Sequence, residues 1–173
     1  SSFYVNEDVL IPRSETEILV EMAINFYNKN LSHQESIRIV DVGTGSGNII
    51  LSFLKDIHSP VEAYAIDQCE KALSIAQKNY FLHEYSIHEK TKIHFLQQNR
   101  LDHFQSKVHL IMSNPPYIKT HKDSKNVHHQ VFKYEPHQAL FIEDDHYESW
   151  FKLMLEQTAN YLLPEGLFLM EGH

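Results

Sequence analysis

Cysteine is almost absent from this chain. The 173 residues include one cysteine, Cys69, so no disulfide can form within the chain. This excludes the disulfide-stabilised secreted domains and fits a reducing compartment. Apolar runs are short, none approaching the roughly 20 residues that span a bilayer, and the start SSFYVNEDV has no signal-peptide pattern. We therefore expect a soluble, cytoplasmic protein without a membrane partner.

Basic residues are also few. Fifteen Lys and Arg stand against 23 Asp and Glu, which gives a net charge of −8 and no cationic cluster. Because affinity for nucleic acid depends on neutralising phosphates, no stable nucleic-acid binding is expected. What the chain does have is 42 % hydrophobic and 12 % aromatic residues, the composition of a globular fold. This length suits one domain with a proper core.

Thirteen histidines are scattered along the chain. Those of the polar stretch after residue 119 lack the compact spacing of zinc ligands and have no cysteine nearby. They are His121, His128, His129 and His137. No metal site is expected.

Short apolar runs alternate with segments of helical periodicity. Strands are expected at 37–42, 61–67, 92–97, 108–113 and 166–172, and helices at 14–29, 48–57, 69–82 and 147–162. This alternation predicts an α/β fold, a mostly parallel twisted sheet with helices on both faces.

The helix expected at 14–29 carries its own start signal. Ser14 and Glu17 have the spacing of a capping box at its first turn. Its expected apolar stripe consists of Ile18, Leu19, Met22, Ala23 and Phe26. Before the helix, Pro12 and Arg13 belong to an extended stretch, because proline cannot continue a strand interior.

The first chemical motif, DVGTGSGN at 41–48, lies where the first strand meets the next helix. Its glycines permit a tight turn and close approach of the backbone to a ligand. Asn48 stands where the dinucleotide fingerprint requires glycine, and the Lys-Ser/Thr ending of a P-loop is missing. A loop that cradles phosphate groups is therefore disfavoured. Asp67 ends the second strand, where an acidic residue can accept hydrogen bonds from ribose hydroxyls.

VDVGTGSGN and AIDQCEKAL resemble motifs of the class I S-adenosylmethionine-dependent methyltransferases. The resemblance implies a Rossmann-like fold with S-adenosylmethionine as cofactor and S-adenosylhomocysteine as product. It implies that the glycine loop and Asp67 contact the methionine and ribose parts, and that adenine lies near Asn99 and Arg100. The family usually has an acidic and then an apolar residue at those last two positions. The implied cofactor-binding residues are Gly43, Thr44, Gly45, Ser46, Gly47, Asp67, Asn99, Arg100 and Asn114.

The second motif, SNPPYI at 113–118, follows the fourth strand. Two prolines make a rigid corner at the sheet edge where ligands bind in α/β folds. A conjugated nitrogen is a weak nucleophile, so a site that methylates it must hold its N–H groups on fixed acceptors. The Asn114 side-chain oxygen and the Pro115 carbonyl are candidates, and Tyr117 can stack on the planar group. Pro116 locks the corner, so the orientation is set beforehand.

NPPY occurs in both glutamine and adenine N-methyltransferases, and the flanking segments favour the first. VLIPRSETEILVE, DVGTGSGNI, NPPYI and KYEPHQALF appear in the order found in the PrmC/HemK family of release factor glutamine methyltransferases, which this chain resembles. The resemblance implies that Asn114, Pro115 and Tyr117 act in catalysis. It also implies that Pro116, Pro12 and Arg13 join them in binding a glutamine of a release factor.

Departures from the family pattern leave alternatives open. Ser14 replaces a proline, and FIEDDHYES replaces a glycine-rich stretch. Residues 1–30 are expected to lead into a cofactor-binding domain at 31–173, with the family's helical N-terminal domain and last two strands missing from this chain. One alternative is an adenine-N6 methyltransferase acting on nucleic acid, which would use the same NPPY motif. The other is an inactive methyltransferase-like binding module, which Asn99, Arg100 and the missing strands suggest.

Overall fold

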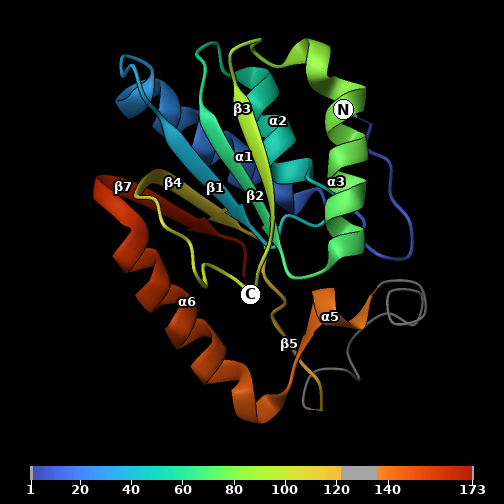
Figure 1. The fold of residues 1–173 in the computed structure, drawn as a ribbon. Coiled ribbons are helices and arrows are strands. Elements are labelled where there is room, and N and C mark those ends of the chain that lie inside the picture. The colour runs from blue at the N-terminus through green and yellow to red at the C-terminus, as the bar shows by residue number, and fades with distance from the viewer. Residues whose placement is uncertain (1, 122–135, 173) are drawn as a thin grey trace.

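A five-stranded parallel sheet forms the centre of the molecule (Figure 1). The computed structural model describes residues 2–121 and 136–172. The strand order is β3-β2-β1-β4-β7. The strands are β1 (Arg38–Val42), β2 (Glu62–Asp67), β3 (Lys92–Gln97), β4 (Val108–Ser113) and β7 (Leu162–Met170). All five predicted strands are present, and the predicted α/β fold class is confirmed.

Parallel pairing brings the carboxyl ends of the strands to one edge of the sheet. Val42 at the end of β1 is in register with Ile66 of β2 and Ser113 of β4, while Asp67 pairs with Gln97 of β3. The segments that follow β1, β2, β3 and β4 therefore start side by side. Both motifs found in the sequence begin at this edge.

Helices cover both faces of the sheet. α1 (Glu15–Phe26) and α2 (Asn48–Asp56) share one hydrophobic cluster with Ile39 of β1, and α3 (Glu70–His83) packs beside α2. α6 (Tyr147–Tyr161) covers the other face, where Met154 packs with Val40 and Ile111. Burial of β1 on both faces explains why Ile39, Val40 and Val42 are all apolar.

α1 differs from the prediction at its start and on its buried face. Ser14 has helical backbone angles, and its hydroxyl donates to Glu15 and not to the helix backbone, so the predicted capping box is wrong. Ile18 and Met22 are 61 % and 52 % exposed, so the predicted stripe is wrong at those two positions. The buried residues follow the helical spacing i, i+3, i+4, i+7: Thr16, Leu19, Val20 and Ala23. The helix is therefore rotated so that a threonine faces inward. A π-helical turn, Tyr27–Leu31, extends it.

Two short strands not expected from the sequence follow the proline corner. β5 (Ile118–Lys119) pairs in parallel with β6 (Phe141–Ile142), which follows the short helix α5 (His137–Leu140). Short 3₁₀ turns occur at Glu84–Ser86 and Asp144–His146. Of the family-like stretch 133–141, residues 133–135 lie outside the described residues, as do His128 and His129. Within the described residues, no helix has both the length and the apolar character needed to cross a bilayer.

Candidate functional site

A cleft opens at the carboxyl edge of the sheet. It is lined by the glycine loop, by residues after β2 and β3, by the corner after β4 and by the N-terminal segment. The predicted site residues that line it are Pro12, Arg13, Gly43, Thr44, Gly45, Ser46, Asp67, Asn99, Arg100, Asn114, Pro115 and Pro116. Gly47 and Tyr117 lie outside this lining. The tertiary structure therefore gathers most of the predicted residues in one place.

The glycine loop depends on backbone angles that other residues rarely adopt. Gly43, Gly45 and Gly47 have φ of 74°, 53° and 79°. The Gly43 N–H donates to the Ile66 carbonyl at 2.8 Å, which ties the loop to the end of β2. A Cβ at Gly47 would lie 3.2 Å from the Ala76 Cβ, so this glycine lets α2 begin close against α3. Gly47 thus shapes the loop from outside the cleft.

Asp67 is held at the cleft by its neighbours' backbone. Its Oδ2 accepts from the Gly45 N–H and its Oδ1 from the Cys69 N–H, each at 2.9 Å. Burial raises the pKa of Asp67, and these hydrogen bonds oppose the rise. The carboxyl group is oriented by donors on both sides, and its remaining lone pairs can accept from hydroxyl groups in the cleft.

Asp41 lies buried beneath the same loop. The Thr44 hydroxyl donates to Asp41 Oδ2 at 2.7 Å, and Oδ1 has no partner among the described residues. Burial raises the pKa of Asp41 to about 7, and the nearby Asp67 charge adds to the rise. Asp41 does not line the cleft. It therefore supports the loop from below.

An arginine and a tryptophan bound the far end of the cleft. Arg100 follows β3 with φ of 52°, and its guanidinium carbon lies 5.6 Å from the centre of the Trp150 ring of α6. The side chain of Arg100 is 11 % exposed, and one guanidinium nitrogen lies 3.9 Å from the Asp102 carboxylate. Its Nε is buried without a partner among the described residues. Asn99 lines the cleft beside it, so this end presents both polar donors and flat surfaces.

The Asn-Pro-Pro corner connects the cleft to a smaller pocket. Asn114, Pro115 and Pro116 line both cavities, and Tyr117 lines the smaller one. The Ser113 hydroxyl, immediately before the corner, donates to the Val42 carbonyl at 2.7 Å. The chain at the corner is thereby fixed to the end of β1. The corner is therefore part of a wall that the two cavities share, together with Leu10, Arg13 and Ala139.

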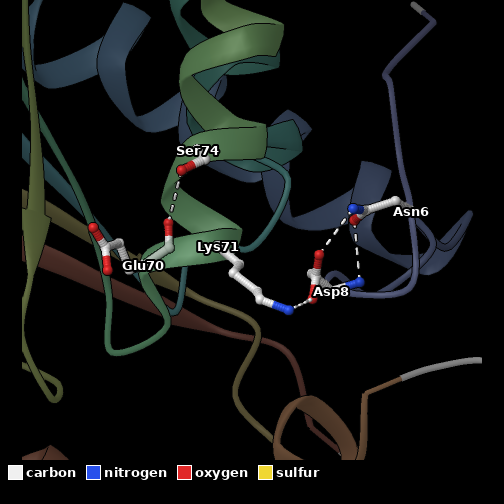
Figure 2. Close-up of polar contacts among 5 residues, drawn as sticks. All are labelled: Asn6, Asp8, Glu70, Lys71 and Ser74. Carbon is white, nitrogen blue, oxygen red and sulfur yellow. Dashed lines mark hydrogen bonds and ion pairs between the residues drawn. The ribbon is translucent and has the colours of Figure 1, made fainter.

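The N-terminal segment, meaning the described residues before α1, forms one wall of the cleft. Pro12 and Arg13 were predicted there; Asp8, which also lines the cleft, was not. Figure 2 shows how Lys71 of α3 reaches the Asp8 carboxylate at 3.2 Å, while the Asn6 side chain bonds to Asp8 at 2.9 Å. These contacts hold the segment against α3.

Asn79 fastens the same segment from inside. This fully buried residue of α3 accepts from the Tyr4 N–H at 2.7 Å and donates to the carbonyls of Tyr4 and Ser46 at 2.9 and 2.8 Å. It therefore joins the N-terminal segment to the glycine loop. Sequence reasoning missed it, although a polar residue on the buried face of α3 was a usable signal.

The fold is Rossmann-like, and its solved structural neighbours are class I methyltransferases. The catalytic domain in the structure "hMettl16 catalytic domain in complex with MAT2A 3'UTR hairpin 1" superposes with a TM-score of 0.62 at 18 % identity, over 93 % of this chain and 58 % of that one. A putative class I S-adenosylmethionine-dependent methyltransferase from Listeria monocytogenes gives 0.57 at 17 %, over 98 % and 47 %. At these identities the likeness shows the fold alone.

The sequence comparison narrows the class to a family. Residues 18–140 match the family described as "Methyltransferase small domain", and the chain belongs to it. Curated relatives named "Release factor glutamine methyltransferase" include those of Flavobacterium psychrophilum, 39 % identical over 98 % of this chain, and Haemophilus influenzae, 31 % identical over 96 %. The chain spans 57 % of the length of each of these proteins.

Proposed function

We propose that this chain transfers the methyl group of S-adenosylmethionine to the side-chain amide nitrogen, N5, of a glutamine in a protein, namely a peptide chain release factor. One observation carries the proposal. The Asn114-Pro115 corner stands between the large cleft and the smaller pocket that contains Tyr117. The names of the curated relatives support the choice of substrate.

The residues of the cleft fit the cofactor. The oriented Asp67 carboxyl group suits two ribose hydroxyls, and the positive-φ glycines leave room beside the loop. Asn99 and Arg100 would meet the adenine ring, since each offers side-chain groups for its edge or face. S-adenosylmethionine supplies a methyl group on a sulfonium, which is a good leaving group. No general base is therefore required at the moment of transfer.

The smaller pocket fits a flat amide. The glutamine amide would lie against Tyr117, with its two N–H groups on the Asn114 side-chain oxygen and the Pro115 carbonyl. Pro116 keeps the corner rigid, so these acceptors are placed before the substrate arrives. Pro12 and Arg13 would contact the protein around the glutamine, because they border the cleft from the N-terminal segment.

The proposal is tested by methyl transfer from radiolabelled cofactor to three acceptors: a release factor, the same protein with its target glutamine changed to alanine, and adenine-containing nucleic acid. The radiolabel should enter only the release factor that keeps its target glutamine. Label in the nucleic acid would favour the adenine-N6 activity, which the net charge of −8 disfavours. Cofactor binding without transfer to any acceptor would favour the binding module.

Asn114→Ala tests the corner itself. We expect the rate to fall by at least about 100-fold, because an acceptor and the orientation of the amide are both lost. The dissociation constant of S-adenosylmethionine, measured by calorimetry, should change much less. Asn114→Asp keeps an acceptor oxygen but loses the amide donor, so it should retain more activity than alanine only if an acceptor is all that the substrate needs. Unchanged turnover in Asn114→Ala would contradict the role of this corner.

A further inference from the structure

A short hydrogen-bonded chain joins Asn114 to two residues that are far from it in the sequence. The Thr16 hydroxyl donates to a Glu171 carboxylate oxygen at 2.7 Å, and Asn114 Nδ2 donates to the same hydroxyl at 3.4 Å. Thr16 belongs to the first turn of α1 and is 3 % exposed, and Glu171 directly follows β7. Three segments thus meet at one threonine.

The chemistry of the three side chains fixes which atom donates in each of the two hydrogen bonds. An ionised carboxylate only accepts hydrogen bonds, so the single proton of the Thr16 hydroxyl is committed to Glu171. The hydroxyl then has only lone pairs to offer Asn114, and the partner must be the amide nitrogen. Reversing the Asn114 amide would bring two acceptors together without a proton between them.

Glu171 is itself fixed in place by the sheet. Its backbone N–H donates to the Ser113 carbonyl at 3.0 Å, and the neighbouring Met170 is in register with Ser113. The carboxylate therefore originates beside the residue that precedes Asn114. Because both ends of the hydrogen-bonded chain start from the paired ends of β4 and β7, neither can shift without disturbing the sheet.

We infer that Thr16 and Glu171 are positioning residues that hold the Asn114 amide in one orientation, with Nδ2 toward α1 and Oδ1 left to accept from the substrate. This inference rests on the proposed function for its consequence: a reversed amide would point N–H groups at the N–H groups of a glutamine. Thr16 also borders the cleft, whereas Glu171 does not; we assign the effect of both residues on methyl transfer to their hold on Asn114.

Thr16→Val and Thr16→Ser form the matched pair that tests the inference. Valine keeps the shape and removes the hydroxyl, whereas serine keeps the hydroxyl. We expect kcat for methyl transfer to fall about 10-fold or more in Thr16→Val and to stay within about 3-fold in Thr16→Ser. Because Thr16 also borders the cleft, the dissociation constant of S-adenosylmethionine is measured for both variants and should change much less than kcat does. Equal kcat in the valine variant and the wild type would overturn the inference.

Glu171→Ala tests whether Glu171 acts on Asn114 by way of Thr16. If Glu171 acts through Thr16, its loss should lower kcat in the wild-type background and have no further effect in the Thr16→Val background. A full additional loss in the double variant would show that Glu171 acts independently, which contradicts the inference.

A measurement that needs no methyl transfer separates this inference from the proposed function. The side-chain amide signals of Asn114 in ¹⁵N-labelled protein are assigned by their disappearance in Asn114→Asp. Their exchange with water should be slowed in the wild type and in Thr16→Ser, and faster in Thr16→Val. The same exchange in all three proteins would overturn the positioning role. No transfer to glutamine by the wild type, with these amide differences present, would overturn the proposed function alone.

Discussion

At the scale of the residue, Asp41 is a carboxyl group that the fold buries completely. Its pKa rises from 3.8 to about 7 because it is fully buried. The folded state therefore holds this proton more tightly than the unfolded state does. The stability that comes from this tighter proton binding is complete below about pH 4 and is lost as the pH rises through about 7. The free energy of unfolding falls by a total of about 4 kcal/mol over this range.

Asp41→Asn should remove that pH dependence. The amide is neutral at every pH and can still accept from the Thr44 hydroxyl, so the variant should match the wild type near pH 4 and be more stable at pH 8. Chemical denaturation at several pH values measures the difference. Asp56→Asn, at an exposed position on α2, is the control and should leave the curve almost unchanged. A parallel curve for Asp41→Asn and the wild type would show that Asp41 is not the group responsible.

Arg100 provides the second prediction at this scale. Its guanidinium carbon lies 5.6 Å from the centre of the Trp150 ring, and both residues line the cleft, where adenine is proposed to bind. Arg100→Leu keeps an aliphatic side chain but removes the cation, so binding of S-adenosylmethionine should weaken by about 0.5–2 kcal/mol, the range of cation–π contacts. Calorimetry with adenosine, which contains only that end of the cofactor, should show a similar loss. Unchanged adenosine binding would place the adenine elsewhere.

At the scale of the element, the N-terminal segment and α3 work as a unit through Asn79. Asn79→Ala would leave the Tyr4 N–H and the carbonyls of Tyr4 and Ser46 without their partner. We expect the free energy of unfolding to fall by about 2–4 kcal/mol, since buried groups lose their hydrogen bonds. Cofactor binding should weaken as well, because Ser46 belongs to the glycine loop.

Gln77→Ala is the matched control for Asn79→Ala. Gln77 lies on the exposed side of the same helix, so its removal changes neither the segment nor the loop. Urea denaturation should separate the two variants clearly. Similar midpoints for both would mean that the buried hydrogen bonds of Asn79 add nothing to the stability of the folded state.

At the scale of the whole molecule, the cleft draws on segments that follow four different strands. A ligand that binds there binds the folded state alone. At 100 times its dissociation constant, S-adenosylmethionine should stabilise the fold by about 2.7 kcal/mol, which raises the melting temperature by roughly 5–11 °C. NADH should give no shift, and Asp67→Ala should lose most of the shift given by S-adenosylmethionine. A shift with NADH and none with S-adenosylmethionine would contradict the proposed cofactor.

Local sequence patterns are enough to predict the five strands of the central sheet, most helix bounds and the two motifs at the sheet edge. They did not predict β5 and β6, nor the start of β7 at Leu162. These follow from local causes: apolar runs form buried strands, glycines allow positive φ, and prolines end a strand. Parallel pairing then brings the glycine loop and the Asn-Pro-Pro corner together without further information, because both follow the carboxyl ends of strands. Hence the fold class could be predicted, and most of the predicted site residues line the cleft.

The side chains that support those motifs could not be predicted, because packing between distant segments selects them. Thr16 meets Asn114 across 98 positions and Glu171 across 155, and no local pattern encodes such pairs. The rotation of α1 that buries Thr16 and exposes Ile18 is set by packing against α2 and β7, since burial on folding outweighs the helix's own apolar pattern. Trp150 faces the cleft for the same reason: its place depends on where α6 lies on the sheet, which is a property of the whole fold.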